Sequence, residues 1–172
     1  MQLVACTHDA HAAAILEILN DEIVHSTALY DYRPRRPESM AGWFKAKETA
    51  RFPVIGAIDA NRLLGFASYG TFRAWPAYKY TVEHSVYVHR DHRGEGTGSA
   101  LMKKLIDAAR IQDYHVMVGG IDADNRTSIA MHEKLGFVHA GTIRHAGYKF
   151  GRWLDLAFYQ LLLETPLWAV ED

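Results

Sequence analysis

Cysteine, net charge and long apolar runs are all scarce in this sequence of 172 residues. Cys6 is the only cysteine, so no internal disulfide can form and a reducing compartment is expected. The 19 basic and 20 acidic residues leave a formal net charge of −1, too little to attract nucleic acid or an anionic membrane. No apolar run approaches the roughly 18–20 residues of a membrane-spanning helix, and the N-terminus lacks a secretory signal pattern. We therefore expect a cytoplasmic protein with neither nucleic-acid nor membrane partners.

The remaining composition is ordinary for a soluble globular protein, with 49% hydrophobic and 23% charged residues. A chain of this length fits one domain with a core of normal size. No internal repeat, low-complexity tract or clear boundary divides it. The sequence therefore predicts a single domain over residues 1–172.

Hydrophobic periodicity and capping residues predict a mixed α/β fold. Strands are expected at residues 2–6, 53–58, 63–69, 80–89, 115–119, 137–143 and 153–163. Helices are expected at about 7–20, 38–49, 97–110 and 125–135, the last one ending at Gly136. Residues 21–37 and 71–80 are irregular and rich in aromatic and basic side chains. The predicted order of elements is β-α-α-β-β-β-α-β-α-β-β.

The stretch from His84 to Leu101 is the most informative part of the sequence. An alternating apolar strand leads into Gly94, Gly96 and Gly98, and an amphipathic helix follows at once. The N–H groups at such a helix N-terminus are bare, and the helix dipole favours negative charge there. The junction therefore predicts a ligand that contains phosphate.

Two common phosphate-binding loops match this junction poorly. A P-loop ends in Gly-Lys-Ser/Thr, but Ser99 and Ala100 follow Gly98, so the phosphate-binding lysine is missing. A dinucleotide fingerprint needs a third glycine three residues after the second, and Ser99 or Leu101 stands there. Three expected strands also precede the loop, whereas a dinucleotide-binding unit usually opens on its first strand.

The pattern Arg93-x-x-Gly96-x-Gly98, between a strand and a helix, resembles the pyrophosphate-binding signature of the GNAT superfamily of N-acetyltransferases. The segment Asn-Arg-Thr-Ser…His-Glu-Lys-Leu-Gly-Phe at 125–137 is similar to the second acetyl-CoA segment of that superfamily. Residues 81–88 and 147–155 resemble its phosphinothricin N-acetyltransferase-like branch, which acetylates the α-amine of phosphinothricin, methionine sulfoximine and methionine sulfone. The resemblance covers nearly the whole chain. It implies a mixed, splayed central sheet flanked by helices.

The resemblance also implies acetyl-CoA as cosubstrate. The backbone N–H groups of the glycine loop would surround the pyrophosphate, and the Arg93 guanidinium would add a contact to a phosphate. The strand before the loop would pair through its backbone with the pantetheine arm, and Asn125 would reach a pantetheine amide or simply cap its helix. The cofactor-binding residues implied in this way are Ser85, Val86, Tyr87, Val88, Arg93, Gly94, Glu95, Gly96, Thr97, Gly98, Ser99 and Asn125.

A zinc site is not expected, although His84, His89 and His92 lie close together in the sequence. Strand alternation places His84 and His89 on opposite faces, and no cysteine or second cluster completes a tetrahedral set. We therefore predict no bound metal.

Acetylation of an amine requires a neutral amine, a polarised carbonyl and a thiolate that can leave. A free α-amine has a pKa of about 8, so a modest base is sufficient. Glu83, at the start of the strand expected beside the thioester, is the candidate base; a surface carboxylate is the alternative. His132 stands where the superfamily commonly has a tyrosine that protonates the thiolate; packing or capping is the alternative. The backbone N–H of Val86 or a neighbour would polarise the carbonyl.

Recognition of the acceptor is expected from segments outside the cofactor motifs. Arg73 is the candidate for binding a substrate carboxylate through a bidentate pair. Weaker candidates for the pocket wall are Phe72, Tyr30, Tyr32, Tyr78 and Thr142. The same aromatic density suits a dimer interface. The resemblance implies a homodimer, in which residues 161–170 could take part.

The leading hypothesis is direct transfer of an acetyl group from acetyl-CoA to the α-amine of a small amino-acid analogue in a ternary complex. An alternative enzyme is a protein N-terminal α-amine acetyltransferase, which Arg73 disfavours because a peptide has no free carboxylate near its amine. An alternative outside the enzymes is a non-catalytic CoA-binding sensor, which would not need a base such as Glu83.

Overall fold

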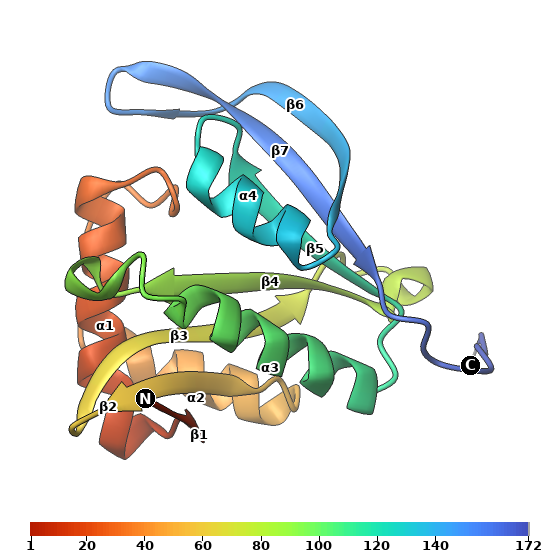
Figure 1. Ribbon diagram of the computed structural model, residues 1–172, viewed down its shortest axis with the longest axis horizontal. Coiled ribbons are helices and arrows are strands. Elements are labelled where there is room, and N and C mark those ends of the chain that lie inside the picture. The colour runs from red at the N-terminus through yellow and green to blue at the C-terminus, as the bar shows by residue number, and fades with distance from the viewer. Residues whose placement is uncertain (172) are drawn as a thin grey trace. The chain divides into compact units, whose positions relative to one another are not determined.

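The computed structural model describes residues 1–171 (Figure 1). Its strands and helices in chain order are β1 (Gln2–Ala5), α1 (His8–His25), α2 (Ser39–Thr49), β2 (Val54–Asp59), β3 (Arg62–Thr71), β4 (Thr81–Val88), α3 (Thr97–Ile111), β5 (Val116–Asp122), α4 (Arg126–Lys134), β6 (Val138–Lys149) and β7 (Arg152–Leu162). The strands form a mixed sheet in the order β1-β2-β3-β4-β5-β7-β6. Both the α/β class and the predicted order of elements are confirmed. None of the helices within residues 1–171 is long and apolar enough to cross a membrane.

Two elements extend furthest beyond the ranges that the sequence pattern predicted. Helix α1 continues to His25 instead of ending at Asn20, because Glu22 and Ile23 are buried and extend its inner face. Strand β6 continues to Lys149 instead of ending near Ile143 and forms a hairpin with β7. The segment expected to be irregular from residue 21 therefore begins only after α1, at Ser26.

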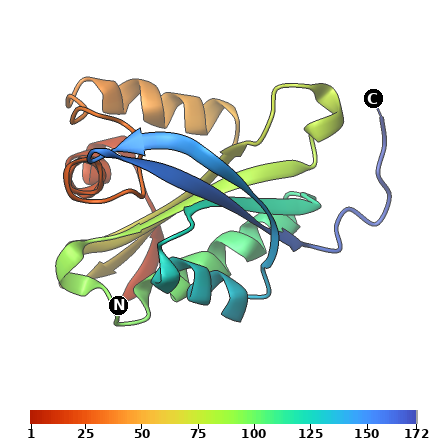
Figure 2. The ribbon, with the colours of Figure 1, turned by 90° about the horizontal axis from the view of Figure 1, so that it is seen from above.

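The chain folds into two compact units, and the first comprises Met1–Tyr69 and Ser85–Leu105. Strands β1, β2 and β3 are antiparallel there. Figure 2 shows α1 and α2 on one face of these strands and the first part of α3 on the other. The core below α1 and α2 consists of Ile15, Ile18, Leu19, Met40, Phe44, Val54, Leu63 and Phe66. This core packs against α1, which carries Asp21 and Glu22 near its C-terminal end.

The second unit comprises Gly70–His84 and the chain from Ile106 onward. Strand β5 runs antiparallel to β7 over its whole length, and β7 pairs in turn with β6. The parallel pairing of β4 with β5 is short: it runs from Thr81↔Val116 to Glu83↔Val118, although β4 continues to Val88. Helix α4 lies on one face of β5 (Figure 1). That residues 1–172 form one domain stays a prediction.

Candidate active site

The loop between β4 and α3 exposes its backbone through Gly94 and Gly96. Their φ values of 81° and 85° lie in the left-handed region that favours glycine, and a Cβ on either would meet no atom of residues 1–171 within 4 Å. The Ala100 N–H donates to Gly96 O and closes the first turn of α3. Because the first N–H groups of a helix have no partner within it, those of Gly98 and Ser99 are free to bind a ligand. This backbone fits a pyrophosphate.

The Arg93 side chain extends from the same loop to helix α1. Its Nη2 lies 2.6 Å from Glu22 Oε1, and its Nε donates to Val88 O over 3.2 Å. The Glu22 side chain is only 7% exposed, whereas that of Arg93 is 50% exposed. The side-chain contact between Arg93 and phosphate that the sequence predicted would have to use guanidinium N–H groups other than those engaged with Glu22 and Val88.

At the end of β4, one residue is exposed and the three that follow it are half-buried. Ser85 is exposed, whereas Val86, Tyr87 and Val88 are half-buried. Tyr87 packs on Phe66, with 5.5 Å between ring centroids. Burial raises the pKa of Tyr87 to about 12, so its hydroxyl stays protonated at neutral pH. Pairing of this backbone with a pantetheine arm stays a prediction.

Glu83 and Arg73, predicted as base and carboxylate ligand, interact electrostatically in the structure. Glu83 is half-buried on β4, and burial raises the pKa of its carboxyl, while the Arg73 charge acts in the opposite direction. Glu83 Oε1 lies 3.2 Å from where a Cβ on Gly120 would stand, so the bare backbone of β5 leaves room for the carboxylate. A carboxylate whose pKa is moved toward neutrality is suited to proton transfer.

Arg73 also belongs to a small aromatic cluster. Its guanidinium lies over the Phe72 ring at 5.4 Å, and Phe72 meets Tyr78 edge-on at 5.8 Å. The structure thus brings together three of the predicted acceptor residues. Thr142 lies elsewhere on β6, where its Oγ1 is 2.9 Å from His139 Nε2.

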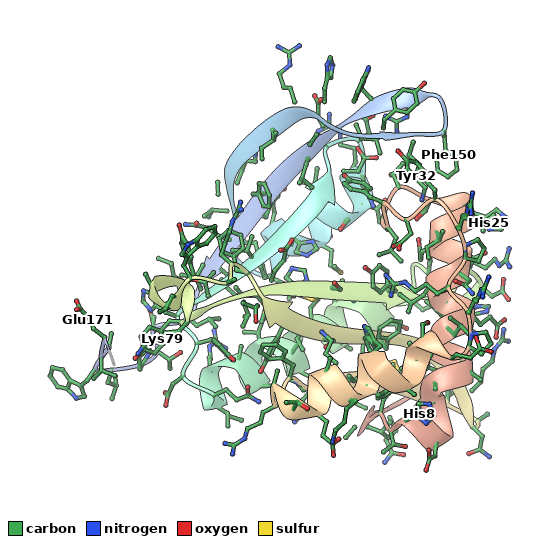
Figure 3. All side chains as sticks on the ribbon, turned by 180° about the vertical axis from the view of Figure 1, so that it is seen from behind. His8, His25, Tyr32, Lys79, Phe150 and Glu171 are labelled. Carbon is green, nitrogen blue, oxygen red and sulfur yellow. The ribbon has the colours of Figure 1, made fainter. Side chains whose placement is uncertain are left out.

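The segment between α1 and α2 carries the two remaining aromatic candidates, Tyr30 and Tyr32. Tyr30 is 38% exposed and Tyr32 is 74% exposed, and Figure 3 shows Tyr32 at the surface of this segment. The segment is held to α1 by Asn20, whose side chain exchanges two hydrogen bonds with the backbone of Arg35. A role for either tyrosine in the pocket wall stays a prediction.

The sequence did not reveal that His132 pairs with His84. The two rings are nearly parallel at 18°, and their Nε2 atoms are 3.1 Å apart. Phe137 packs edge-on against both rings. His132 is 1% exposed and His84 7%, so the pair is buried. A Cβ on Gly119 would lie 2.6 Å from His84 Nε2, so glycine at that position makes the pair possible.

The hydrogen bonds of this pair fix where its protons lie. His132 Nδ1 is 2.7 Å from Ser128 O, and because a carbonyl oxygen only accepts, Nδ1 carries the proton. His132 Nε2 is then an acceptor, and His84 Nε2–H donates to it. His84 Nδ1 is buried and has no hydrogen-bond partner among residues 1–171. Burial lowers the pKa of both imidazoles, so both are neutral at neutral pH. In this arrangement His132 has no free N–H with which to protonate a thiolate.

Asn125 is the N-cap of α4, since its Oδ1 accepts from the Ser128 N–H over 3.1 Å. This is one of the two roles predicted for Asn125, and the contact with pantetheine stays a prediction. Cys6 packs beside the core of the first unit, and burial raises the pKa of its thiol to about 12.

These features define a class of protein. A mixed sheet with a short β4–β5 ladder, a glycine loop at the N-terminus of α3 and a half-buried glutamate on β4 are the expected parts of a CoA-dependent N-acetyltransferase. The profile of the Acetyltransferase (GNAT) family matches residues 13–137, and the chain belongs to this family.

Similar proteins extend over nearly the whole chain. An L-methionine sulfoximine/L-methionine sulfone acetyltransferase of Pseudomonas paraeruginosa is 44% identical over 156 residues, which cover 90% of this chain and 91% of that protein. A solved structure from Acinetobacter baylyi ADP1 is 62% identical with a TM-score of 0.98 and covers 99% of this chain and 97% of its own. The phosphinothricin acetyltransferase of Sinorhizobium meliloti, solved in complex with acetyl-CoA, is 30% identical with a TM-score of 0.93; the match covers 98% of this chain and 91% of that one.

The buried histidine pair predicts a loss of stability in mild acid. Burial and the charge of His132 lower the pKa of His84 to about 3 from 6.5. Below pH 6.5 the unfolded chain therefore binds a proton that the folded chain excludes. For His84 alone, the free energy of unfolding should fall by about 2 kcal/mol between pH 6.5 and pH 5.

Urea unfolding at several pH values measures this slope. His84→Gln should flatten it, whereas His8→Gln, at a histidine whose side chain is 47% exposed, should leave it unchanged. An equal slope in wild type and His84→Gln would show that His84 does not exclude a proton.

Proposed function

We propose that this protein transfers the acetyl group of acetyl-CoA to the α-amine of a small amino-acid analogue of the methionine sulfone, methionine sulfoximine or phosphinothricin type. The observation that carries the proposal is the half-buried Glu83 within electrostatic reach of Arg73. An α-amino acid presents an amine that needs a base and a carboxylate that needs a cation, and this pair offers both. The names of the similar proteins support the same class of acceptor.

The residues that bind acetyl-CoA are proposed from the backbone that the structure leaves accessible. The glycine loop, Arg93 to Ser99, would hold the pyrophosphate through its N–H groups and the positive end of α3. The backbone of Ser85 to Val88 and the Asn125 side chain would bind the pantetheine. Acetyl-CoA supplies a thioester, whose carbonyl carbon accepts the amine and whose thiolate departs.

Three groups of the chain would carry the chemistry. Glu83 would accept the proton that the amine loses, directly or through a water. The backbone N–H of Val86 or a neighbour would donate to the carbonyl oxygen, where negative charge develops. His132 is the proposed proton donor to the thiolate, in a state where its hydrogen bond with His84 has opened and His132 Nε2 has taken up a proton. Burial lowers the pKa of His132, so this protonated state gives up its proton more readily than an ordinary histidine.

Acceptor specificity would come from the cluster of Phe72, Arg73 and Tyr78, with Tyr30, Tyr32 and Thr142 as further wall residues. A peptide N-terminus has no free carboxylate beside its amine, so Arg73 near Glu83 disfavours a protein N-terminal acetyltransferase. A CoA sensor would not need Glu83 at all. Release of CoA thiol with methionine sulfone or phosphinothricin, compared with an N-terminal peptide, tests these alternatives. CoA binding without turnover of any amine would favour the sensor.

Arg73→Ala should raise the KM for methionine sulfone roughly 10- to 100-fold, because a charge-assisted hydrogen bond is worth about 1.5–3 kcal/mol. The KM for the carboxamide of the same acceptor, which has no carboxylate to bind, should change little. Steady-state kinetics with both acceptors measures the difference. Lys79→Ala, at a cation over the Tyr80 ring on the same segment, is the matched control. If Arg73→Ala raised the KM for the acid and for the amide equally, Arg73 would not bind the substrate carboxylate.

Glu83→Gln should lower kcat/KM by about 10²- to 10⁴-fold, which is the usual contribution of a general base. The loss should be largest well below the amine pKa of about 8 and should shrink above it, because solvent then supplies the neutral amine. The wild-type profile should fall in acid above the usual glutamate value of 4.5, because burial raises the pKa of Glu83. Glu48→Gln, at a carboxylate that is 75% exposed, is the control. A loss that is the same at every pH would exclude the base role.

We also propose that the protein acts as a cytoplasmic homodimer that detoxifies amino-acid analogues. Large apolar side chains are exposed in the second unit, on the β6–β7 hairpin and the C-terminal tail. These include Tyr148, Phe150, Trp153, Leu167 and Trp168. Figure 3 shows Phe150 at the tip of that hairpin. A monomeric mass in light scattering would contradict the dimer.

A further inference from the structure

We propose that Glu22 is a positioning residue for the cofactor loop: it holds the Arg93 side chain and thereby fixes the backbone that receives the pyrophosphate. The proposal deepens the proposed function and rests on it. In this proposal the Arg93 side chain is a brace, meaning that it links the start of the cofactor loop to α1. This role replaces the contact with phosphate that the sequence suggested.

Both oxygens of the Glu22 carboxylate are engaged. Oε1 lies 2.6 Å from Arg93 Nη2, and Oε2 accepts a hydrogen bond from the Ser26 hydroxyl over 2.5 Å. Ser26 is the C-cap of α1, and its backbone N–H donates to Glu22 O. The carboxylate is thus fixed in orientation before it meets Arg93. A buried charge fixed in this way holds its partner strongly, because breaking the pair leaves an uncompensated charge.

Arg93 joins three elements through these contacts. Its guanidinium reaches α1 at Glu22, its Nε donates to Val88 O at the end of β4, and its backbone starts the glycine loop. The neighbouring Asp21 lies 4.0 Å from Arg93 and 3.1 Å from Arg90, so a second ion pair secures the same turn of chain to α1.

Such a brace matters because the loop that follows contains Gly94 and Gly96. Glycine loses more conformational freedom than any other residue when its backbone is fixed. A ligand that has to order a mobile loop binds more weakly than one that meets an ordered loop. Arg93, held at both ends, orders the start of the loop before the ligand arrives.

A direct contact of Arg93 with phosphate makes the opposite prediction. Glu22 would then compete with the phosphate for the guanidinium, and neutralising Glu22 would release Arg93 and strengthen binding. If Arg93 is a brace, the same substitution loosens the loop and weakens binding. The sign of the change therefore separates the two roles.

Titration calorimetry with CoA on the full chain makes the measurement. Glu22→Gln should raise the Kd for CoA about tenfold, which corresponds to 1.4 kcal/mol. The kcat at saturating acetyl-CoA and the KM for methionine sulfone should change less than twofold. General unfolding would instead lower the kcat together with the affinity for CoA. Glu17→Gln removes the same charge from a 72% exposed position of α1 and should leave the Kd unchanged. An unchanged or lower Kd in Glu22→Gln overturns the proposal.

A double-mutant cycle gives an independent test. Arg93→Gln and the double variant with Glu22→Gln should bind CoA as weakly as Glu22→Gln alone, because one brace is lost in each case. Additive losses would overturn the brace.

Salt dependence tests the proposal even if the single variant Glu22→Gln fails to fold, because the double variant Glu22→Gln/Arg93→Gln leaves neither partner of the ion pair as an unpaired charge. The loss of CoA affinity in the double variant should be equal at low and high salt. A larger loss at low salt would identify a direct contact with phosphate. Failure of the wild type to bind CoA would refute the proposed function itself and is distinct from all these outcomes.

Discussion

The parallel ladder between β4 and β5 holds Glu83 in place and stops at that residue. Backbone N–H and C=O groups that are removed from water need hydrogen-bond partners, so a strand that loses its neighbour needs another. In the proposed complex, pantetheine provides that partner for the strand beyond Glu83. Two adjacent glycines of β5 serve the same region: Gly120 leaves room for the Glu83 carboxylate, and Gly119 leaves room for the His84 ring. The absence of two side chains thus shapes the site as much as the residues that act in it.

The fold accommodates its buried polar side chains in two different ways. Glu22 forms an ion pair with Arg93, and a hydroxyl donates to its second carboxylate oxygen. His84 and His132 stay neutral, and a backbone carbonyl fixes the direction of their hydrogen bonds. The ion pair suits a part that must stay fixed around a doubly anionic ligand. The neutral pair places no charge in the core that another group would have to compensate.

The elements and the glycine loop could be predicted from the sequence because their signals are local: apolar periodicity, capping residues and the spacing of Arg93, Gly96 and Gly98. The end of α1 was missed because Glu22, a charged residue at a buried position, breaks the apolar pattern that marks a helix. The partners of the site residues could not be predicted either. Glu22 and Arg93 are distant in sequence, as are His84 and His132, and no local pattern reports such a contact.

The single thiol of the chain has a practical consequence for the transfer that we propose. An enzyme that releases a thiol from a thioester is exposed to side reactions, because a protein thiolate can capture the acyl group or exchange disulfides with the product. The pKa of Cys6, raised to about 12 by burial, leaves almost no thiolate at neutral pH. Cys6 is therefore not expected to react with the CoA thiol that the enzyme releases. A chromogenic disulfide can report each CoA released in the folded enzyme without a background from the protein.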